Sequence, residues 1–406
     1  MVCYFFPPIR ASAIARTLGF VNNLPKNGYT PVVLTVKSSK DKWGVVANNE
    51  NIPKSIEVTR TYEFNLHRPI ELLDTLVNKL FQLFSLKIRK YYFRENICIP
   101  DTQIAWIPVA KGVKQARECQ CIYVSCSPFS SALYACMIKK ITKKPLIVDF
   151  RDAWTLNPHS LNHTYFHRVM IRLMEKWVIN TCDALLLNTN GALELYQDGY
   201  PSYQDKFYCI PNGYGKLNCP ETINNEGFKI IHVGSFYGDR KPDELLDAIS
   251  ELDFKNNIEF IQVGANFVGY EKYTDKVNMT LTGPVNNEEA LKIMASASLL
   301  YLKQGRENKI VSSIAVAAKT YEYISTGIPI LCDCPKGDNV EIVEKYAMNS
   351  FIANEGSKEE LKRLIHQAYN EKMTLPELNK DFVTQYSRQA LTTKLSDVID
   401  KVTGKC

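Results

Sequence analysis

The sequence has none of the short motifs by which many proteins hold phosphates or metal ions. No G-x-G-x-x-G follows the first apolar run, so the fingerprint of a nicotinamide dinucleotide site is missing, and no G-x-x-x-x-G-K-[ST] phosphate loop occurs. The chain also lacks a D-x-D pair of carboxylates, which removes one common way of holding a metal ion on a diphosphate. A phosphate-bearing ligand would therefore need other groups.

Long apolar segments are missing too. No run approaches the roughly 18–20 residues that a membrane-spanning helix needs, and Met1 is not followed by a charged leader and an apolar stretch. We therefore expect a cytoplasmic protein.

The twelve cysteines lack the spacing of a zinc ribbon or a redox motif. There is no C-x-x-C, and the only close pairs are Cys119 with Cys121 and Cys332 with Cys334. Since many of the others lie inside apolar runs, we expect buried free thiols, with structural zinc or disulfides as the alternatives.

Histidine is scarce, with six residues in the chain. His159, His163 and His167 stand four residues apart and could line one helix face, but no fourth ligand accompanies them. We expect no metal site and no cofactor.

What is present is the composition of an ordinary globular protein, with 45% hydrophobic and 23% charged residues. A chain of 406 residues is too long for one core, which favours two domains of roughly 200 residues. Residues 1–215 hold 26 Lys and Arg against 16 Asp and Glu, whereas the remainder holds 23 against 27. The basic first half indicates an anionic partner such as phosphates or a membrane surface, and we expect no nucleic acid.

Thirteen short apolar runs punctuate the chain, at 2–6, 31–36, 55–60, 121–126, 145–150, 184–189, 207–212, 229–234, 258–264, 278–283, 298–303, 328–333 and 350–354. They are continuous rather than alternating, which is typical of parallel strands covered on both faces, and helical patterns lie between them. The pattern predicts two doubly wound α/β domains in tandem, joined near residues 213–227, with one or two helices over 381–402.

One insert, residues 61–120, breaks this rhythm. Within it, 69–94 has apolar residues at helical spacing and a basic end with Lys87, Arg89, Lys90 and Arg94. Two interpretations stay open: a helix packed on its own domain with a solvated end, or an interfacial helix that docks on anionic lipid.

Charged residues gather where strands are predicted to end in the second half. Ligands of open parallel sheets bind beyond the carboxyl ends of the strands, where helix N-termini offer N–H groups to anions. Arg240 and Lys241 follow the first run of this half, and Lys319 and Glu322 open a helix before a later run. Cations for phosphates and a carboxylate for ribose hydroxyls suit a nucleoside diphosphate; ordinary surface charges are the alternative.

The matching loops of the first half supply Arg10, Ser12, Ser127, Arg151 and Asp152. Hydroxyl and N–H groups at the start of a helix suit a hydroxylated or phosphorylated ligand. For the last two residues, an ion pair without function is the alternative.

Seven segments, in their order and spacing, resemble glycosyltransferase family 4, which consists of retaining enzymes of the GT-B fold. They are YFFPPIRASAIARTLGFVNNL, SPFSSAL, DFRDAWT, IPNGYG, VGSFYGDRKP, TGPVNNEEALKIMASASLLY and KTYEYISTGIPIL. The likeness covers nearly the whole chain. It implies two Rossmann-like domains facing across a cleft: 1–215 for the acceptor, 216–380 for the nucleotide sugar, and a helical segment, 381–406, returning towards the first domain.

The resemblance also assigns donor contacts. Glu322 matches the second acid of the family's E-x7-E signature, which binds the ribose, and Arg240 falls where the family has a diphosphate-binding Lys. Lys319 would face the same phosphates, while Gly283 and Val285 lie in the loop that contacts the base.

Further donor contacts are expected from Gly234, Ser235 and Lys241, and acceptor contacts from the first-half loops. The implied substrates are a UDP- or GDP-linked sugar and a lipid-linked glycan, in bacterial surface polysaccharide synthesis at the inner membrane face. The 69–94 helix would then contact that membrane.

Two departures from the family pattern matter. Ile314 stands at the position of the first acid of E-x7-E, and the glycines of the family's first loop are replaced by Arg10, Ala11 and Ala13. Side chains now occupy space that glycines leave open.

The expected reaction is metal-independent transfer with retention, in which Arg240 and Lys319 stabilise the leaving diphosphate and Asp152 helps to orient the acceptor. The alternatives are a non-catalytic nucleotide-sugar-binding scaffold and a nucleotide-sugar epimerase or hydrolase.

Overall fold

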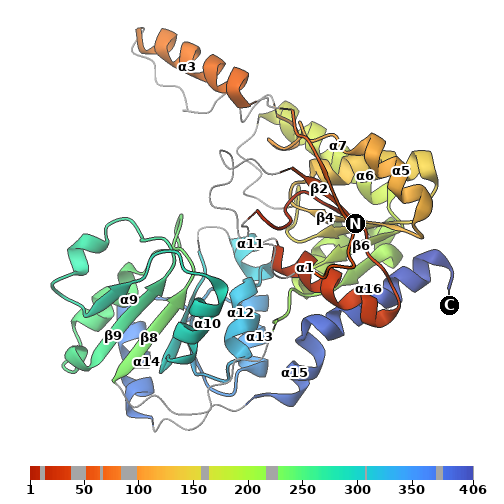
Figure 1. Cartoon of the computed structure of the whole chain (residues 1–406). Coiled ribbons are helices and arrows are strands. Elements are labelled where there is room, and N and C mark those ends of the chain that lie inside the picture. Colours follow the sequence, from red (N-terminus) through yellow and green to blue (C-terminus); the bar gives the residue numbers. More distant parts are fainter. Residues whose placement is uncertain are drawn as a thin grey trace. The chain divides into compact units, whose positions relative to one another are not determined.

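The computed structural model describes residues 1–9, 14–37, 52–64, 67–83, 98–156, 164–215, 227–306, 309–371 and 378–405. The chain divides into two compact units (Figure 1): unit 1 holds Met1–Pro211 and Leu391–Cys406, and unit 2 holds Asn212–Ala390. Each unit is built on one parallel sheet.

The sheet of unit 1 has seven strands in the order β3-β2-β1-β4-β5-β6-β7, all paired in parallel. The strands are β1 (Val2–Cys3), β2 (Val33–Val36), β3 (Val58–Thr61), β4 (Ile122–Cys126), β5 (Leu146–Phe150), β6 (Ala184–Leu187) and β7 (Phe207–Cys209). β4 and β5 are buried at every residue because both sheet faces are covered, whereas the edge strand β3 is half-buried.

Unit 1 contains helices α1 (Ile14–Asn23), α3 (His67–Leu83), α5 (Val109–Glu118), α6 (Ser130–Thr142), α7 (Tyr165–Thr181) and α8 (Asn190–Gly199), with 3₁₀ turns η1 (Leu24–Asn27) and η3 (Pro201–Lys206). Phe20 of α1 and Leu395 of α16 (Arg388–Thr403) pack together with Ile147 and Leu186 of the sheet. Right-handed crossovers place α6 and α7 on the opposite face, because β4, β5 and β6 follow one another in the other direction from β1 and β2.

The sheet of unit 2 has six parallel strands in the order β10-β9-β8-β11-β12-β13. They are β8 (Phe228–Val233), β9 (Ile258–Val263), β10 (Met279–Leu281), β11 (Leu299–Lys303), β12 (Ile330–Asp333) and β13 (Ser350–Ile352). Its helical elements are α9 (Asp243–Ser250), η4 (Lys255–Asn257), η5 (Tyr270–Tyr273), α10 (Asn287–Ala295), α11 (Lys309–Ile314), α12 (Ala318–Ile324), α13 (Asp338–Tyr346), α14 (Lys358–Asn370) and α15 (Lys380–Tyr386).

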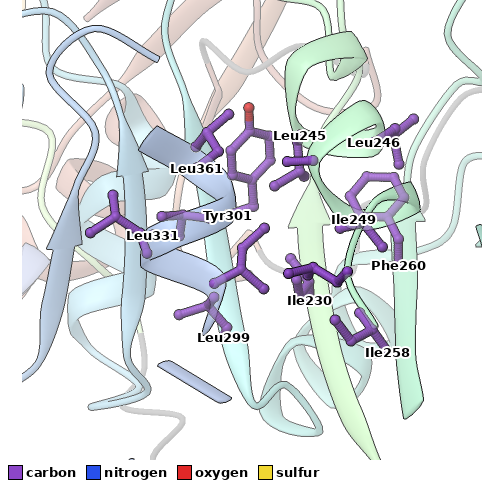
Figure 2. Packing of buried hydrophobic residues seen from close by; sticks show 14 of the residues in the cluster. Ile230, Leu245, Leu246, Ile249, Ile258, Phe260, Leu299, Tyr301, Leu331 and Leu361 are labelled. Atoms are coloured by element: carbon purple, nitrogen blue, oxygen red, sulfur yellow. The ribbon is translucent and has the colours of Figure 1, made fainter. Parts of the chain in front are cut away.

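Figure 2 shows how one face of this sheet is covered. Leu245 and Ile249 of α9 and Leu361 of α14 lie over Ile230 and Leu299 of the central strands, and all five side chains are fully buried. The continuous apolar runs are thus explained by burial rather than by an alternating, half-solvated sheet.

The predicted fold class is confirmed: every one of the thirteen apolar runs overlaps one of these strands, and both sheets are parallel with helical crossovers. Of the helix predicted over 69–94, α3 covers the first part, and residues 84–94 lie outside the described residues. Leu73, one of the apolar residues at helical spacing in this segment, is 46% exposed.

The strand order reverses once in each sheet. β1 lies between β2 and β4 in unit 1, and β8 lies between β9 and β11 in unit 2. Ligands of open α/β sheets bind beyond the carboxyl ends of the strands at such a switch point. The segments that follow β8 and β11 are therefore the place to look for a site in unit 2.

Candidate functional site

Two glycines bring the ends of β8 and β9 into close backbone contact. Gly234 follows β8 with φ 125° and Gly264 follows β9 with φ 144°, values that residues with a side chain rarely adopt. A Cβ atom on Gly264 would stand 2.8 Å from the carbonyl carbon of Gly234. A Cβ on Gly234 would stand 2.8 Å from Nζ of Lys319, so the bare backbone there lies directly beside a lysine ammonium.

Lys319 is held by a buried histidine, His232. Its Nζ lies 3.0 Å from Nε2 of His232, while Nδ1 of the same ring lies 2.8 Å from the carbonyl oxygen of Tyr301. Since a carbonyl can only accept, Nδ1 carries the proton and Nε2 accepts a hydrogen bond from Lys319. Burial, and then the Lys319 charge, lower the pKa of His232 well below its ordinary value, so the imidazole is neutral.

The environment of Lys319 favours loss of its own proton. Burial, and then the charge of Arg240, lower the pKa of Lys319 from 10.5 to about 7. An anion bound against the ammonium would offset both effects and restore the positive charge. A lysine placed this way, beside glycine backbone at the switch point, is suited to receive an anion.

Arg240 stands in the turn between β8 and α9. Its Nη1 donates to the hydroxyl of Tyr237 at 2.5 Å, and the guanidinium lies 4.8 Å from the centre of that ring. Asp239 accepts from the backbone N–H of Arg306, just beyond β11, at 2.7 Å. The turn is thereby tied to the neighbouring strand, and Arg240 is brought close enough to act on the pKa of Lys319. Lys241, the next residue, is exposed.

Glu322 lies one turn beyond Lys319 on α12 and has a partner of its own. Nη2 of Arg388 donates to its Oε1 at 2.8 Å, and the backbone N–H of Gly215 also donates to the carboxylate. Burial raises the pKa of Glu322, and the charge of Arg388 opposes that rise. If a ribose binds there, the Glu322 carboxylate therefore either accepts from a ribose hydroxyl as well as from Arg388, or gives up its ion pair with Arg388.

The turn after β10 joins the same edge of the sheet. Gly283 has φ 68°, and its carbonyl accepts from the backbone N–H of Gly264 at 3.1 Å. Oγ of Ser235 accepts from the backbone N–H of Ala265 at 3.1 Å. Val285 is half-buried against the core. The turns after β8, β9 and β10 are thus bonded to one another, which brings three of the predicted donor residues, Gly234, Ser235 and Gly283, to one edge of the sheet.

A buried polar network fixes the start of α12. Nε2 of Gln304 donates to the carbonyls of Ser312 and Ala315, at 3.0 and 3.1 Å, and its Oε1 accepts from Nδ2 of Asn339 at 2.9 Å. Oγ1 of Thr320, the residue after the candidate lysine, donates to Oδ1 of Asn339 at 2.6 Å. The network therefore sets where α12 begins.

In unit 1, Ser127 follows β4 and leads into α6. The turn is held by Asp101, whose carboxylate accepts from the backbone N–H and the hydroxyl of Ser130, each at 2.8 Å. Burial raises the pKa of Asp101, and the backbone N–H of Ser130 opposes that rise. The turn is well fixed, although Ser127 itself makes none of these bonds.

Arg151 and Asp152 follow β5, the next strand of the sheet. Their side chains lie 4.0 Å apart, and Asp152 is exposed. The backbone N–H of Arg151 donates to the carbonyl of Cys126 at 3.3 Å, which places these residues next to the turn at Ser127. Arg10 and Ser12 lie outside the described residues.

Two residues of the unit 2 site, His232 and Arg388, were missed from sequence. A histidine that directly follows two isoleucines near the end of a strand was the available signal for His232, because a buried imidazole needs partners. No local signal marks Arg388, which stands 66 residues from Glu322.

Metal-binding clusters are not part of this site. Within the described residues, no three or more His, Cys, Asp or Glu side chains gather where they could hold a metal ion. His167 lies buried on α7 with its Nδ1 2.5 Å from Oγ1 of Thr164, and His159 and His163 lie outside the described residues. Ten of the twelve cysteines are described and all ten are free; seven of them are buried, as predicted, whereas Cys119, Cys121 and Cys209 are half-buried. In the same part of the chain, no helix is long and apolar enough to cross a bilayer.

Solved structures match this fold over the whole chain. HepE from Anabaena, in complex with UDP and glucose, matches with a TM-score of 0.65 and 12% identity over 98% of both chains. The lipopolysaccharide outer core galactosyltransferase WaaB matches with a TM-score of 0.55 and 13% identity over 99% of both chains. A putative UDP-N-acetylglucosamine 2-epimerase from Listeria monocytogenes matches with a TM-score of 0.56 and 11% identity, over 100% of this chain and 97% of that one.

No protein-family model and no curated protein matches the sequence. At identities this low the structural matches show the fold alone. That fold is the GT-B architecture, with two Rossmann-like parallel-sheet domains in one chain, as the sequence resemblance implied.

Proposed function

We propose that the protein is a glycosyltransferase that moves a sugar from a nucleotide-sugar donor, bound by unit 2, to a hydroxyl of an acceptor. The observation that carries the proposal is the Lys319 ammonium, set against the backbone of Gly234 with Arg240 nearby, at the strand switch point. A diphosphate fits this place, since ligands bind there and both cations complement its charge. The UDP bound to the structural neighbour HepE supports a nucleotide of this kind.

The chemistry follows from charge. When the anomeric bond breaks, negative charge gathers on the leaving diphosphate, and fixed cations beside it stabilise the transition state more than the ground state. Lys319 and Arg240 supply that charge, with exposed Lys241 as a further cation, so the transfer needs no metal ion in this proposal. His232 keeps Lys319 aimed at the site through its hydrogen bond.

The finer parts of the proposal concern stereochemistry and acceptor. We infer retention, with a phosphate oxygen of the leaving group taking the acceptor proton and Asp152 orienting the acceptor. The acceptor is a lipid-linked glycan of bacterial surface polysaccharide synthesis, reached at the inner face of the membrane. In support, Leu72, Leu73 and Leu76 of α3 are exposed, and the structural neighbour WaaB is a galactosyltransferase of the lipopolysaccharide core.

The first experiment is a thermal-shift screen against UDP, GDP, CDP and their sugars. A ligand at about 100 times its Kd adds roughly 2.7 kcal/mol of stability, enough for a clear rise in Tm. We expect a rise with one nucleotide series that is reduced in Glu322→Ala. No rise with any nucleotide would contradict the donor site.

Turnover of the active donor then tests the cations. Removing one charge-stabilising donor typically costs about 10²–10³ in kcat, and we expect Arg240→Ala to lose activity on that scale. The matched control is Lys276→Ala, an exposed cation elsewhere in unit 2, which should stay active. Arg240→Ala turnover within about a factor of two of the wild type would refute the assigned role.

Two other functions have specific observations in their favour. Ile314 in place of an acid, and the pairing of Glu322 with Arg388, favour a nucleotide-sugar-binding scaffold; nucleotide binding without turnover across an acceptor panel would support it. The fold shared with a putative epimerase favours epimerisation or hydrolysis. Loss of the sugar nucleotide in a control without acceptor would identify that chemistry.

A further inference from the structure

Two neighbouring helices of unit 1, α6 and α7, expose apolar side chains. Met137 and Ile141, one turn apart on α6, are 44% and 56% exposed, and Leu173 on α7 is 57% exposed. Nζ of Lys140 on α6 lies 5.1 Å from the ring centre of Trp177 on α7, so the exposed rows of the two helices meet. We call this surface the α6/α7 face; its members are Met137, Lys140, Ile141, Phe166, Arg172, Leu173, Lys176 and Trp177.

The exposed charges of this face have one sign. The two helices carry five Lys or Arg, of which Lys139 is paired with Asp183, and a single acid, Glu175. Glu175 is fully buried, where its carboxylate accepts from the hydroxyls of Tyr196 and Tyr200 at 2.6 and 2.7 Å. The carboxylate is therefore satisfied inside the unit and offers nothing to the surface. Whatever covers the face must accommodate apolar side chains and positive charge together.

We propose that the α6/α7 face docks on the surface of an anionic lipid bilayer. Apolar side chains enter the boundary between headgroups and acyl chains, and a rim of cations contacts lipid phosphates. Trp177 beside Lys140 suits that boundary, because a tryptophan side chain there can contact apolar groups with its ring and water with its indole N–H. A second copy of the chain is disfavoured as the occupant, because a symmetric contact would oppose two positive faces.

This docking surface is distinct from the 69–94 segment and does not depend on the donor site. Its residues lie on two helices whose inner sides pack in unit 1, with Ile138 of α6 and Val178 of α7 fully buried. Substitutions confined to the exposed side therefore leave the fold intact. Vesicle binding needs no nucleotide, so its outcome is separate from that of the proposed glycosyl transfer.

The test is co-sedimentation of the full chain with phosphatidylcholine vesicles, with and without phosphatidylglycerol, at low and high salt. We expect binding only where phosphatidylglycerol is present, and weaker binding at high salt. In the charge-reversal variant Lys140→Glu/Arg172→Glu/Lys176→Glu, removal of three surface cations should weaken binding roughly 100-fold.

Two further variants make the test specific. The polar variant Met137→Gln/Ile141→Gln/Leu173→Gln keeps every charge and should lose at least about tenfold, because it removes the inserted apolar area. The matched control reverses three exposed lysines outside the face, Lys54→Glu/Lys276→Glu/Lys394→Glu, and should bind nearly as the wild type does. Equal thermal unfolding midpoints would show that all variants fold.

Three outcomes would overturn the proposal. Unchanged binding in both α6/α7 variants, with loss in Lys87→Glu/Arg89→Glu/Lys90→Glu, would assign docking to the 69–94 segment instead. Weaker vesicle binding by the charge-reversal variant, with unchanged binding by the polar variant, would show electrostatic attraction to the bilayer without insertion of the apolar side chains. A dimer in sedimentation velocity that the polar variant dissociates would make a second copy the occupant.

Discussion

The ammonium of Lys319 is buried and has another cation, Arg240, nearby, and both effects lower its pKa, so its charge depends on pH near neutrality. With a pKa of about 7 in the free protein, Lys319 is protonated below pH 7 and increasingly neutral above it. A diphosphate needs the protonated form, and its binding raises the pKa of Lys319.

The first prediction follows from that linkage. UDP affinity should fall as pH rises from about 7 to 9, by up to tenfold per unit, because binding must take up the missing proton. Calorimetry at pH 8 in buffers of different ionisation enthalpy measures this uptake directly. Lys319→Arg should bind UDP with a nearly flat profile, since a guanidinium keeps its charge. An equally steep profile in that variant would assign the pH dependence to another group.

The second prediction concerns Glu322. If its carboxylate accepts from a ribose hydroxyl, 2′-deoxy- or 3′-deoxy-UDP should bind roughly tenfold more weakly than UDP. Glu322→Ala should remove that discrimination, whereas Arg388→Met, which keeps the carboxylate, should retain it. Isothermal calorimetry with the three nucleotides measures the difference. Equal affinities for all three in the wild type would exclude the ribose role.

At the scale of elements, the start of α12 depends on a network that is not local in sequence. Thr320 donates to Asn339, which in turn is bonded to Gln304, and all three side chains are buried. The third prediction is that Thr320→Val leaves Oδ1 of Asn339 without this donor, costs about 1–3 kcal/mol of unfolding free energy, and weakens UDP binding.

A matched variant distinguishes an effect on the position of Lys319 from a general loss of folding stability. Thr326 lies just beyond the end of α12, and Thr326→Val removes an equally buried hydroxyl, which donates to the carbonyl of Tyr323. Denaturant unfolding should show a similar loss in both variants, but only Thr320→Val should raise the Kd for UDP. Equal Kd values in both would mean that the network does not position Lys319.

The same elements show what sequence alone could reach. Continuous apolar runs predicted the strands because burial on both faces leaves no polar alternation, as in β5 and β6. Gly327, three residues beyond the end of α12, has φ 70°, the left-handed conformation that a glycine readily adopts after a helix. The rule that ligands bind beyond the carboxyl ends of parallel strands was enough to predict the turn at Arg240 and the helix at Lys319 as parts of a site, without knowledge of which strands pair.

The contacts inside the site were not predictable in this way. His232 and Lys319 are separated by 87 residues, and Glu322 and Arg388 by 66. Such pairs arise from strand order, which local periodicity does not encode. The proline, glycine and hydrophobic patterns that define each element do not determine which other elements it packs against.

At the scale of the whole molecule, the chain enters unit 2 at Asn212 and leaves it at Ala390, so the last helix belongs to both units. Tyr214 and Ser387 pair as a parallel bridge, which ties the two crossing segments together within unit 2. An amphipathic tail pattern predicts helices over 381–402 but does not say which sheet they cover.

The fourth prediction uses this division. Leu395 of α16 is fully buried in unit 1 beside Phe20, and Leu361 of α14 is fully buried in unit 2. Each Leu→Ala change should cost about 2–5 kcal/mol in its own unit, because it leaves a cavity. Hydrogen exchange read by mass spectrometry should show faster exchange in unit 1 for Leu395→Ala and in unit 2 for Leu361→Ala.

Added UDP then locates the donor site. Because a ligand stabilises the part of the chain that binds it, UDP should restore protection in Leu361→Ala and leave the exchange of unit 1 in Leu395→Ala largely unchanged. Protection of unit 1 alone would move the nucleotide to the other sheet and contradict the roles given to Lys319 and Arg240. Equal protection of both units by UDP would instead mean that they unfold as one cooperative body, so that the ligand's free energy is shared across the chain.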